Sequence, residues 1–560
     1  MVLPVASVLA EQPPSRWVQK IGDQSAYGKG FGLNTNIATR GMAIYRNELY
    51  IGTENLNKAK LKDILGNIAY QVVSAQVAEN AQQAMSEGGK GCLGQTGKLI
   101  QGGANSQYVY QIPGYYWDED YEGYTYSPDG VNQYILEPET FCLPGLRGLV
   151  VFTKLMRFAL HVRSFCSDGG EIWKYNYTTD SWTHIIGSQS VTGIQAGFDY
   201  SFNCAISVLK EFKGYLYAGT WSTPLGSLSN PDRKGCEIWR YNGTTWEQVV
   251  GRHAYQYHGW QNGGFGNPDN VAAWSIEEFN GYLYVGTMNW NLSETGACEI
   301  WRSNNGIQWT KVVDHGFRSN MSANDPDDIA NGVVNTYAWI MKNFSGKLYV
   351  GTFNSRGSLG SNLQGAGAQL WKSSNGVSWI KEPLPNGTQN DFKNGFGEWQ
   401  NYGIRRMEIY DNALYLGIAT HLASSTEGCE IWRYNGSGGR RGWTCIVGEA
   451  APVGEYCMDG FNNTANKYVW SMAVTADGLY AGTAKNGGCQ VYKYKVTSGW
   501  HQLVGNSTHA QEPDGFGDPL NFGARSMIKY PSNTEIVFLG TFTHYVHVPD
   551  VGCEVWMRYP

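Results

Sequence analysis

The stretch Cys236–Gly243 reads CEIWRYNG, and Trp246–Gly251 follows it as WEQVVG. Apolar and polar residues alternate on both sides of a tight Asn-Gly turn, which is typical of a β-hairpin with two half-buried strands. The phrase recurs along the chain, and we count seven copies of it. Because self-similarity at a regular period indicates a repeat architecture, this phrase predicts the fold before any single strand is assigned.

Each repeat has four recognisable strand positions. A phrase such as Leu216–Thr220 (LYAGT) marks the second strand, Trp239 lies in the third, and Trp246 begins the fourth. The first strand follows an Asn, and these residues are Asn36, Asn203, Asn270, Asn335, Asn401, Asn466 and Asn521.

The last repeat lacks a fourth strand because the chain stops at Pro560. The matching segment lies at the other end, where Trp17–Gly22 reads WVQKIG. Four-stranded units arranged radially and closed in this way form a β-propeller. We therefore predict an all-β, seven-bladed β-propeller closed by its N-terminal strand, with an inserted, partly helical cap subdomain in blade 1.

The blades resemble secreted propeller families with Asp-box (BNR) or tectonin-type repeats. The phrases Ser303–Trp309 and Ser373–Trp379 are the nearest matches, although each is one residue shorter than an Asp-box and carries Asn in place of its Asp. The resemblance covers most of the chain and implies architecture, whereas function depends on the site that a fold displays.

The composition argues against two classes of protein. A net charge of −6 disfavours a nucleic-acid binder, which needs a basic face. No stretch of about 18 apolar residues is present, so a membrane-spanning helix is not expected.

The first residues and the sequons favour export. Val2–Ala10 resembles the end of a secretory signal, with an ordinary flexible terminus as the alternative. We therefore expect a secreted or cell-surface glycoprotein. Nine residues begin Asn-x-Ser/Thr sequons: Asn176, Asn242, Asn291, Asn320, Asn343, Asn386, Asn435, Asn462 and Asn506.

An insertion interrupts the first repeat after Thr53, where the spacing between repeat asparagines rises from 67 residues (203 to 270) to 167 (36 to 203). We expect an amphipathic helix over 58–87 and a second helix over 146–165, forming either a cap at the channel mouth or a homo-oligomer contact. The predicted segments are a signal remnant or flexible terminus (1–14), the closing strand with the first half of blade 1 (15–57), the cap subdomain (58–165), the second half of blade 1 (166–187) and blades 2–7 (188–560).

Eleven cysteines are present, an odd number that leaves at least one unpaired within the chain. Five share one repeat position, where Gly170 and Ala368 stand in other copies, so we expect them to be small, buried thiols. These are Cys236, Cys298, Cys429, Cys489 and Cys553. The disulfide candidates, with open pairing, are Cys92, Cys142, Cys166, Cys204, Cys445 and Cys457.

Loop lengths divide the two faces of the predicted ring. Turns between first and second strands are short, as at Asn280-Gly281, whereas second-to-third and interblade connections are long and varied. Functional groups concentrate on such loops, so we expect the functional face there. The interblade loops repeat a Gly-Phe phrase, as in Gly264–Asn267, in which Phe is predicted to pack between blades.

Four residues after each repeat Asn, the sequence varies between Arg, Trp and Ser207. Trp faces stack on sugars and Arg pairs with carboxylate or sulfate, so these positions are candidate ligand-binding residues at the channel mouth. The alternative is a packing role between blades. Three arginines resemble the sialidase cluster, but that family has six blades and a Tyr/Glu nucleophile pair that finds no match here. The candidates are Arg40, Trp274, Trp339, Arg405, Trp470 and Arg525.

Few other residues suggest chemistry. His421, His544 and His547 are weak candidates for bases or metal ligands. Asp325, Asp327 and Asp328 are weak calcium candidates, and no other cofactor is evident.

The leading interpretation is an extracellular propeller that binds a glycan or protein partner, or self-assembles, through its long-loop face. The first alternative is an extracellular carbohydrate-active enzyme, a polysaccharide lyase acting on an acidic sugar, and we lean against enzymatic activity. The second is a structural surface-assembly protein joined through residues 58–165.

Overall fold

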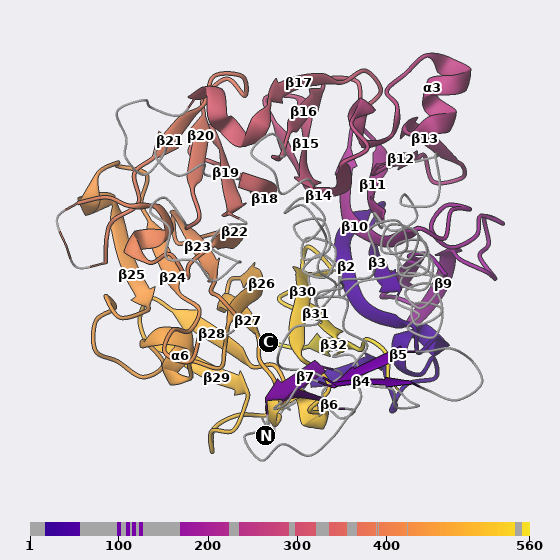
Figure 1. Ribbon diagram of the computed structural model, residues 1–560. Helices are drawn as coiled ribbons and strands as arrows, with labels where there is room; N and C mark the ends of the chain where they lie inside the picture. Colours follow the sequence, from indigo (N-terminus) through magenta and orange to yellow (C-terminus); the bar gives the residue numbers. More distant parts are fainter. Residues whose placement is uncertain are drawn as a thin grey trace, which may run out of the picture. The chain divides into compact units, whose positions relative to one another are not determined.

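The computed structural model of the protein (Figure 1) describes residues 17–55, 168–222, 235–290, 297–320, 335–354, 367–387, 389, 391–422, 424–543 and 551–560, and the backbone of four short strands between 98 and 126. No helix in this part of the chain is long and apolar enough to cross a membrane.

The chain divides into two compact units, Met1–Asn57 with Cys166–Pro560, and Lys58–Phe165. The helices that the sequence predicts over 58–87 and 146–165 lie outside the described residues. The described part of the second unit consists of two antiparallel hairpins: β4 (Lys98–Gln101) with β5 (Tyr108–Gln111), and β6 (Tyr115–Asp118) with β7 (Gly123–Tyr126).

The first unit is one antiparallel sheet of 28 described strands, which repeats as groups of four strands. In chain order the groups are β2 (Asn36–Tyr45), β3 (Glu48–Asn55), β8 (Ile172–Asn176) and β9 (Ser181–Ile186); β10 (Asn203–Phe212), β11 (Tyr215–Ser222), β12 (Ile238–Tyr241) and β13 (Trp246–Val250); β14 (Asn270–Phe279), β15 (Tyr282–Asn289), β16 (Ile300–Ser303) and β17 (Thr310–Val313); β18 (Asn335–Phe344), β19 (Lys347–Asn354), β20 (Leu370–Ser373) and β21 (Ile380–Glu382); β22 (Gly403–Tyr410), β23 (Ala413–Ala419), β24 (Ile431–Tyr434) and β25 (Trp443–Val447); β26 (Tyr468–Thr475), β27 (Gly478–Ala484), β28 (Val491–Lys495) and β29 (Gly499–Val504); and β30 (Gly523–Lys529), β31 (Val537–Phe542) and β32 (Val555–Arg558) with β1 (Trp17–Ile21).

The first two strands of every group close into a ring of fourteen strands in the described chain. The second strand of each group pairs with the first strand of the next at one position, as in Trp221↔Ala272 and Met288↔Tyr337. The last pairing, Ala38↔Phe542, joins β2 to β31 and completes the ring. In Figure 1 the first strands, from β2 and β10 to β30, surround the centre of this unit. The described fold is thus an all-β, closed antiparallel ring of the β-propeller type.

The N-terminal strand completes the last group, as the sequence predicts. β1 pairs antiparallel with β32 in the register Trp17↔Arg558, Val18↔Met557 and Gln19↔Trp556. We call β30, β31, β32 and β1 the closing group. Because its fourth strand comes from the other end of the chain, the first and last strands hold the ring shut.

The short turns follow from residues that tolerate a positive φ. Lys213 and Gly214 have φ of 47° and 80°, and Asn280 and Gly281 have φ of 49° and 77°. Two consecutive positive φ values are characteristic of the type I′ turn, whose twist matches the two strands that it joins. These turns keep one end of each group compact, while the long connections emerge at the other end.

The Gly-Phe phrase forms a recurrent bend between groups. In the sequence Gly264-Phe265, both residues have positive φ (60° and 58°), and the Phe265 ring stacks on Trp301 with centroids 5.0 Å apart. The same stacking joins Phe317 to Trp371 at 4.6 Å, at a copy that the sequence analysis did not single out. Phe265 lies in a buried cluster with Val208 of β10 and Leu283 of β15, so the prediction that Phe packs between neighbouring groups is confirmed. The bends are η1 (Lys29–Gly32), η4 (Gly263–Gly266), η5 (His315–Asn320), η6 (Asn394–Gly397), α6 (Asp459–Asn462) and η8 (Asp514–Gly517). Two more helices are described, α3 (Arg252–His258) and η7 (Arg440–Gly442).

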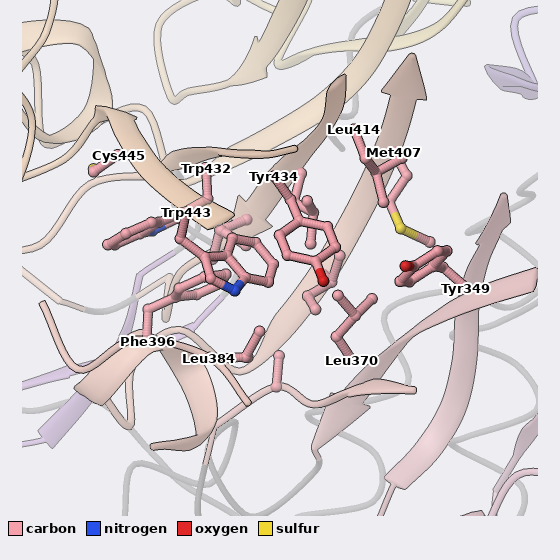
Figure 2. Packing of buried hydrophobic residues seen from close by; sticks show 14 of the residues in the cluster. Tyr349, Leu370, Leu384, Phe396, Met407, Leu414, Trp432, Tyr434, Trp443 and Cys445 are labelled. Atoms are coloured by element: carbon pink, nitrogen blue, oxygen red, sulfur yellow. The ribbon is translucent and has the colours of Figure 1, made fainter. Parts of the chain in front are cut away.

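The hydrophobic core is divided among the interfaces between neighbouring groups. Figure 2 shows one such cluster, in which Phe396 packs against Trp432 and Trp443, with Leu384 below them. The Phe396 and Trp432 rings stack at 4.5 Å, and Trp443 meets Phe396 edge-on at 5.4 Å. Aromatic pairs of this geometry add stability beyond the area that they bury.

The cysteines confirm one prediction and correct another. The five repeat cysteines are free and fully buried, as expected from the small residues at that position. Three disulfide candidates, Cys204, Cys445 and Cys457, are also free thiols, so that prediction is wrong for them. The Cys204 thiol donates to the Trp221 carbonyl, and the Cys445 thiol donates to the Val447 carbonyl. Cys92, Cys142 and Cys166 lie outside the described residues.

We expect the five repeat cysteines to resist alkylation in the folded protein. Burial raises the pKa of each thiol, so the reactive thiolate is scarce at neutral pH. Half-buried Cys457 is expected to react first among the described cysteines. Iodoacetamide labelling with peptide mass spectrometry measures the order, and labelling of a repeat cysteine as fast as Cys457 would contradict this assignment.

Candidate functional site

The six candidate ligand-binding residues all lie on the first strands of their groups. Because these strands begin directly after the loops that join the groups, the residues lie near the end that carries the long connections. We call this set the arginine–aromatic ring. It comprises Arg40 on β2, Trp274 on β14, Trp339 on β18, Arg405 on β22, Trp470 on β26 and Arg525 on β30.

Each arginine of the ring lies against an indole. The guanidinium carbon of Arg40 is 5.1 Å from the centroid of Trp274 and 4.7 Å from that of Trp221. Arg405 lies 4.8 Å from Trp339, and Arg525 lies 5.1 Å from Trp470 in the same way. Attraction between a cation and an aromatic face strengthens when both are shielded from water. The tertiary structure thus combines the arginines and tryptophans into pairs drawn from different groups.

Aromatic side chains that the sequence analysis missed connect these pairs. Tyr337 lies between Trp274 and Trp339, with centroids 5.2 and 5.7 Å away. Tyr468 contacts Trp339 at 6.4 Å and Trp470 at 5.7 Å. Tyr337 and Tyr468 each precede a ring tryptophan by two residues, and strand residues two apart face the same side. This two-residue spacing was the sequence signal that could have identified both tyrosines.

The electrostatics of the ring differ from one arginine to the next. Arg40 is neutralised by Glu54: its Nε donates to Glu54 Oε2 at 2.6 Å, and its Nη2 lies 2.5 Å from the same oxygen. Arg405 and Arg525 are each only 4% exposed, and the Nε of each has no hydrogen-bond partner within the described chain. Burial, followed by the charges of neighbouring arginines including Arg40, holds the pKa of both guanidinium groups well below its usual range. The site therefore concentrates positive charge that is incompletely compensated.

A pair of tyrosines lies beside Arg405. The hydroxyls of Tyr402 and Tyr468 are hydrogen-bonded to each other. Burial, and then the neighbouring Tyr468, raises the pKa of Tyr402 well above its usual value, whereas burial raises the pKa of Tyr468 to about 12. His421 lies next to this pair, with its ring 6.0 Å from that of Tyr402. Both phenols therefore stay protonated at neutral pH and can donate hydrogen bonds.

The other candidates are placed less informatively. Ser207, the serine of the variable position, donates to the carbonyls of Gly219 and Ala273. The sequon residue Asn386 is 8% exposed, and its Nδ2 donates to Asp391 at 2.7 Å. Asn242 instead accepts from Thr244 and Thr245 amides in an exposed turn. The candidates outside the described residues are His544, His547, Asp325, Asp327, Asp328 and Asn291.

A concave surface lies beside α3, at the connection between two groups. This pocket of about 610 Å³ is lined by Trp246, Arg252, His253, Tyr257 and His258. Tyr257 is 65% exposed, and its ring contacts His253 with centroids 4.4 Å apart. The sequence carries no signal of this pocket, because the pocket forms only when the short helix packs over neighbouring strands.

No protein-family model and no curated protein sequence matches the chain. Among solved structures, virginiamycin B lyase from Staphylococcus aureus is 9% identical, with 70% of this chain and 88% of that chain covered and a TM-score of 0.35. The α-L-arabinofuranosidase Arb93A from Fusarium graminearum is 10% identical, with 62% and 91% covered and a TM-score of 0.32. The sialidase of Trypanosoma rangeli is 11% identical, with 62% and 53% covered and a TM-score of 0.34. With scores this low, the fold assignment stands on the strand pairing of the ring.

Proposed function

We propose that the protein binds the anionic group of an acidic glycan at the arginine–aromatic ring. The observation that carries this proposal is the pair Arg405 and Arg525. Their buried Nε atoms have no hydrogen-bond partner among the described residues, and their guanidinium faces lie on tryptophans. A buried cation without full compensation is costly, and a carboxylate or sulfate of a ligand would offset that cost. Trp470 and Trp274 are partly exposed and would stack on sugar rings.

We take the groups as seven blades of a secreted or cell-surface propeller, a count supported by the seven sequence copies of the repeat. Residues 58–165 would form the cap or an oligomer contact, and the sequons would carry glycans. A calcium site at Asp325, Asp327 and Asp328 remains a prediction from the sequence.

Binding of an acidic oligosaccharide is expected to depend on Arg405 and Arg525. Isothermal titration calorimetry with oligogalacturonate should show binding that weakens as salt is added, whereas neutral oligogalactan should bind at least about tenfold more weakly. Arg405→Met and Arg525→Met should each weaken binding by about tenfold or more, because each removes a charged hydrogen-bond donor.

Arg302→Met is the matched control. Arg302 also stacks on an aromatic ring, at 4.5 Å from Tyr282, but it lies beside the Asn375 turn at the short-turn end. Its replacement should leave binding unchanged. Equal loss in all three variants would contradict the proposed site. Loss with Tyr257→Ala, and not with the Arg405 or Arg525 variants, would place binding in the pocket beside α3 instead.

A second candidate function is a lyase reaction on an acidic sugar, favoured by the position of His421 beside Tyr402. In such a reaction a cation neutralises the uronate, a base removes a proton, and a hydroxyl protonates the leaving oxygen. Because its pKa is raised, Tyr402 keeps its proton at neutral pH and could act only as the proton donor, which leaves His421 as the base. Absorbance of the unsaturated product detects the reaction. Product formation that is abolished in His421→Ala would favour the enzyme over the binding protein.

A further inference from the structure

Five carboxylates gather at the long-loop end of the β22–β25 group. The carboxylate oxygens of Glu427, Glu449 and Asp459 lie within 4.8 Å of one another. Glu398 and Glu430 are close enough to interact electrostatically with Asp459. We call these five residues the carboxylate cluster. Like charges at this spacing repel, and either protonation of some carboxylates or a nearby positive charge relieves the repulsion.

The closing group offers an internal comparison, because three carboxylates there surround a lysine. The ammonium of Lys29 lies 2.8 Å from Asp518, 3.1 Å from Asp23 and 3.9 Å from Glu554. Each of these acids has a counterpart in the carboxylate cluster at the same place in the repeat.

The acids of the two groups occupy equivalent positions and share the same hydrogen bonds and backbone conformation. Glu554 accepts from Trp556 Nε1 and Asn521 Nδ2, and Glu430 accepts from the equivalent pair, Trp432 and Asn401. The amides of Asp518 and Glu398 donate to the Gly-Phe bends before them, at Gly515 and Gly395. Asp23 and Glu449 both follow a glycine, Gly22 and Gly448, with φ of 142° and 144°.

The difference lies at the position of the lysine. Lys29 precedes Gly30-Phe31, and Asp459 precedes Gly460-Phe461 in the same bend. Gly30 and Gly460 donate to equivalent carbonyls, those of Cys553 and Cys429. A carboxylate thus replaces the ammonium that neutralises the closing group. Asp459 is 7% exposed, and its Oδ1 has no hydrogen-bond partner within the described chain.

Two further differences between repeats make the cluster more negative: one lacks a lysine and the other adds an acid. Lys311 in the β14–β17 group reaches the buried Glu299 at 3.2 Å, and Cys445 occupies the equivalent position beside Glu430. Glu427 adds a fifth acid where the closing group has Val551.

Among the described residues, the other polar groups near the cluster offset its charge only in part. The Lys467 ammonium donates to the carbonyls of Ser424 and Glu427, so its hydrogen bonds are directed to the backbone. The Cys445 thiol donates to the Val447 carbonyl, and burial raises the pKa of the Cys429 thiol. The atoms of the cluster that could ligate a metal are therefore carboxylate oxygens, which suit a hard cation.

We propose that a divalent cation of the calcium type binds among Glu427, Glu449 and Asp459, at the place where the Lys29 ammonium lies in the closing group. Glu398 and Glu430 supply additional negative charge behind these ligands. The cation would tie the loop before β24, the residue after β25 and the bend of α6 together. Calcium accepts six to eight oxygens in irregular geometry, which allows carboxylates from three separate segments to share it.

Terbium luminescence tests the site directly, with the metal alone as the probe. Trp432 lies beside the cluster, donating to Glu430 at 2.8 Å, so its excitation should sensitise bound Tb³⁺. We expect sensitised emission that Ca²⁺ displaces, and a rise of about 5 °C in the unfolding midpoint at saturating Ca²⁺.

The repeat itself supplies the decisive variant, because Asp459→Lys restores the residue of the closing group. This variant should lose about one equivalent of Ca²⁺ relative to the wild-type chain, while folding without Ca²⁺ at least as stably. Glu449→Gln, at an exposed position, should lower Ca²⁺ affinity about tenfold or more. Glu278→Gln, an exposed acid at the short-turn end, is the control and should change neither property.

Titration calorimetry after treatment with a chelator counts the equivalents. The same number of Ca²⁺ equivalents in the wild type and in Asp459→Lys would overturn the proposal. Should Asp459→Lys fail to fold, unchanged affinity in Glu449→Gln would overturn it equally. Because the arginine–aromatic ring is not part of this cluster, loss of Ca²⁺ can be scored independently of oligosaccharide binding.

Discussion

Deletion of residues 1–21 is expected to remove most of the stability of the ring, lowering the unfolding midpoint by more than about 10 °C. The deletion removes β1, whose Trp17 and Ile21 side chains are 5% and 0% exposed. Trp17 meets Phe516 edge-on at 5.2 Å, and its loss exposes that aromatic contact. Burial of these two side chains alone contributes about 3–6 kcal/mol.

The deletion also leaves the edge of β32 unpaired, which invites association between chains. Size-exclusion chromatography should therefore show higher oligomers along with the lower midpoint in thermal denaturation. Val18→Ala is the matched control within β1, because Val18 is 37% exposed and its truncation should cost less than about 0.5 kcal/mol. A deletion variant that stays monomeric with an unchanged midpoint would show that β1 does not hold the ring closed.

Replacing a single repeat asparagine, as in Asn270→Ala, is expected to lower the free energy of unfolding by about 3–5 kcal/mol. The fully buried Asn270 donates to the Gly264 carbonyl at 3.0 Å and to Glu299 at 2.7 Å. Its Oδ1 accepts from Thr287 and Asn289. Alanine leaves all four partners buried without that side chain, so each loses part of its compensation for desolvation.

Asn270→Asp separates charge from size, since it retains the volume and places a carboxylate beside Glu299. It should destabilise the protein at least as much as Asn270→Ala, measured by urea denaturation. The exposed Asn486→Ala should change stability by less than about 0.5 kcal/mol. If Asn270→Ala unfolds at the same urea concentration as the wild type, the asparagine network is not what anchors the bend to the strand.

The repeating strands and their closure were readable from the amino-acid sequence. The alternation of apolar and polar residues at Cys236–Gly251 reflects local geometry, because side chains in a strand point alternately to two faces. Trp17–Gly22 matches Trp246–Gly251 because both segments form the fourth strand of a group and pack against equivalent residues. The five repeat thiols followed from the small residues, Gly170 and Ala368, at the same position.

The chemistry of the sites depended on contacts between residues far apart in sequence. Arg405 stacks on Trp339 from a neighbouring group, and the loss of compensation at Asp459 becomes evident only beside Glu427 and Glu449. The pairing expected for Cys204, Cys445 and Cys457 failed for the same reason, since cysteine spacing says nothing about distance in space. Strand patterns are local and periodic, whereas burial, charge compensation and side-chain pairing depend on how separate segments meet in the closed ring.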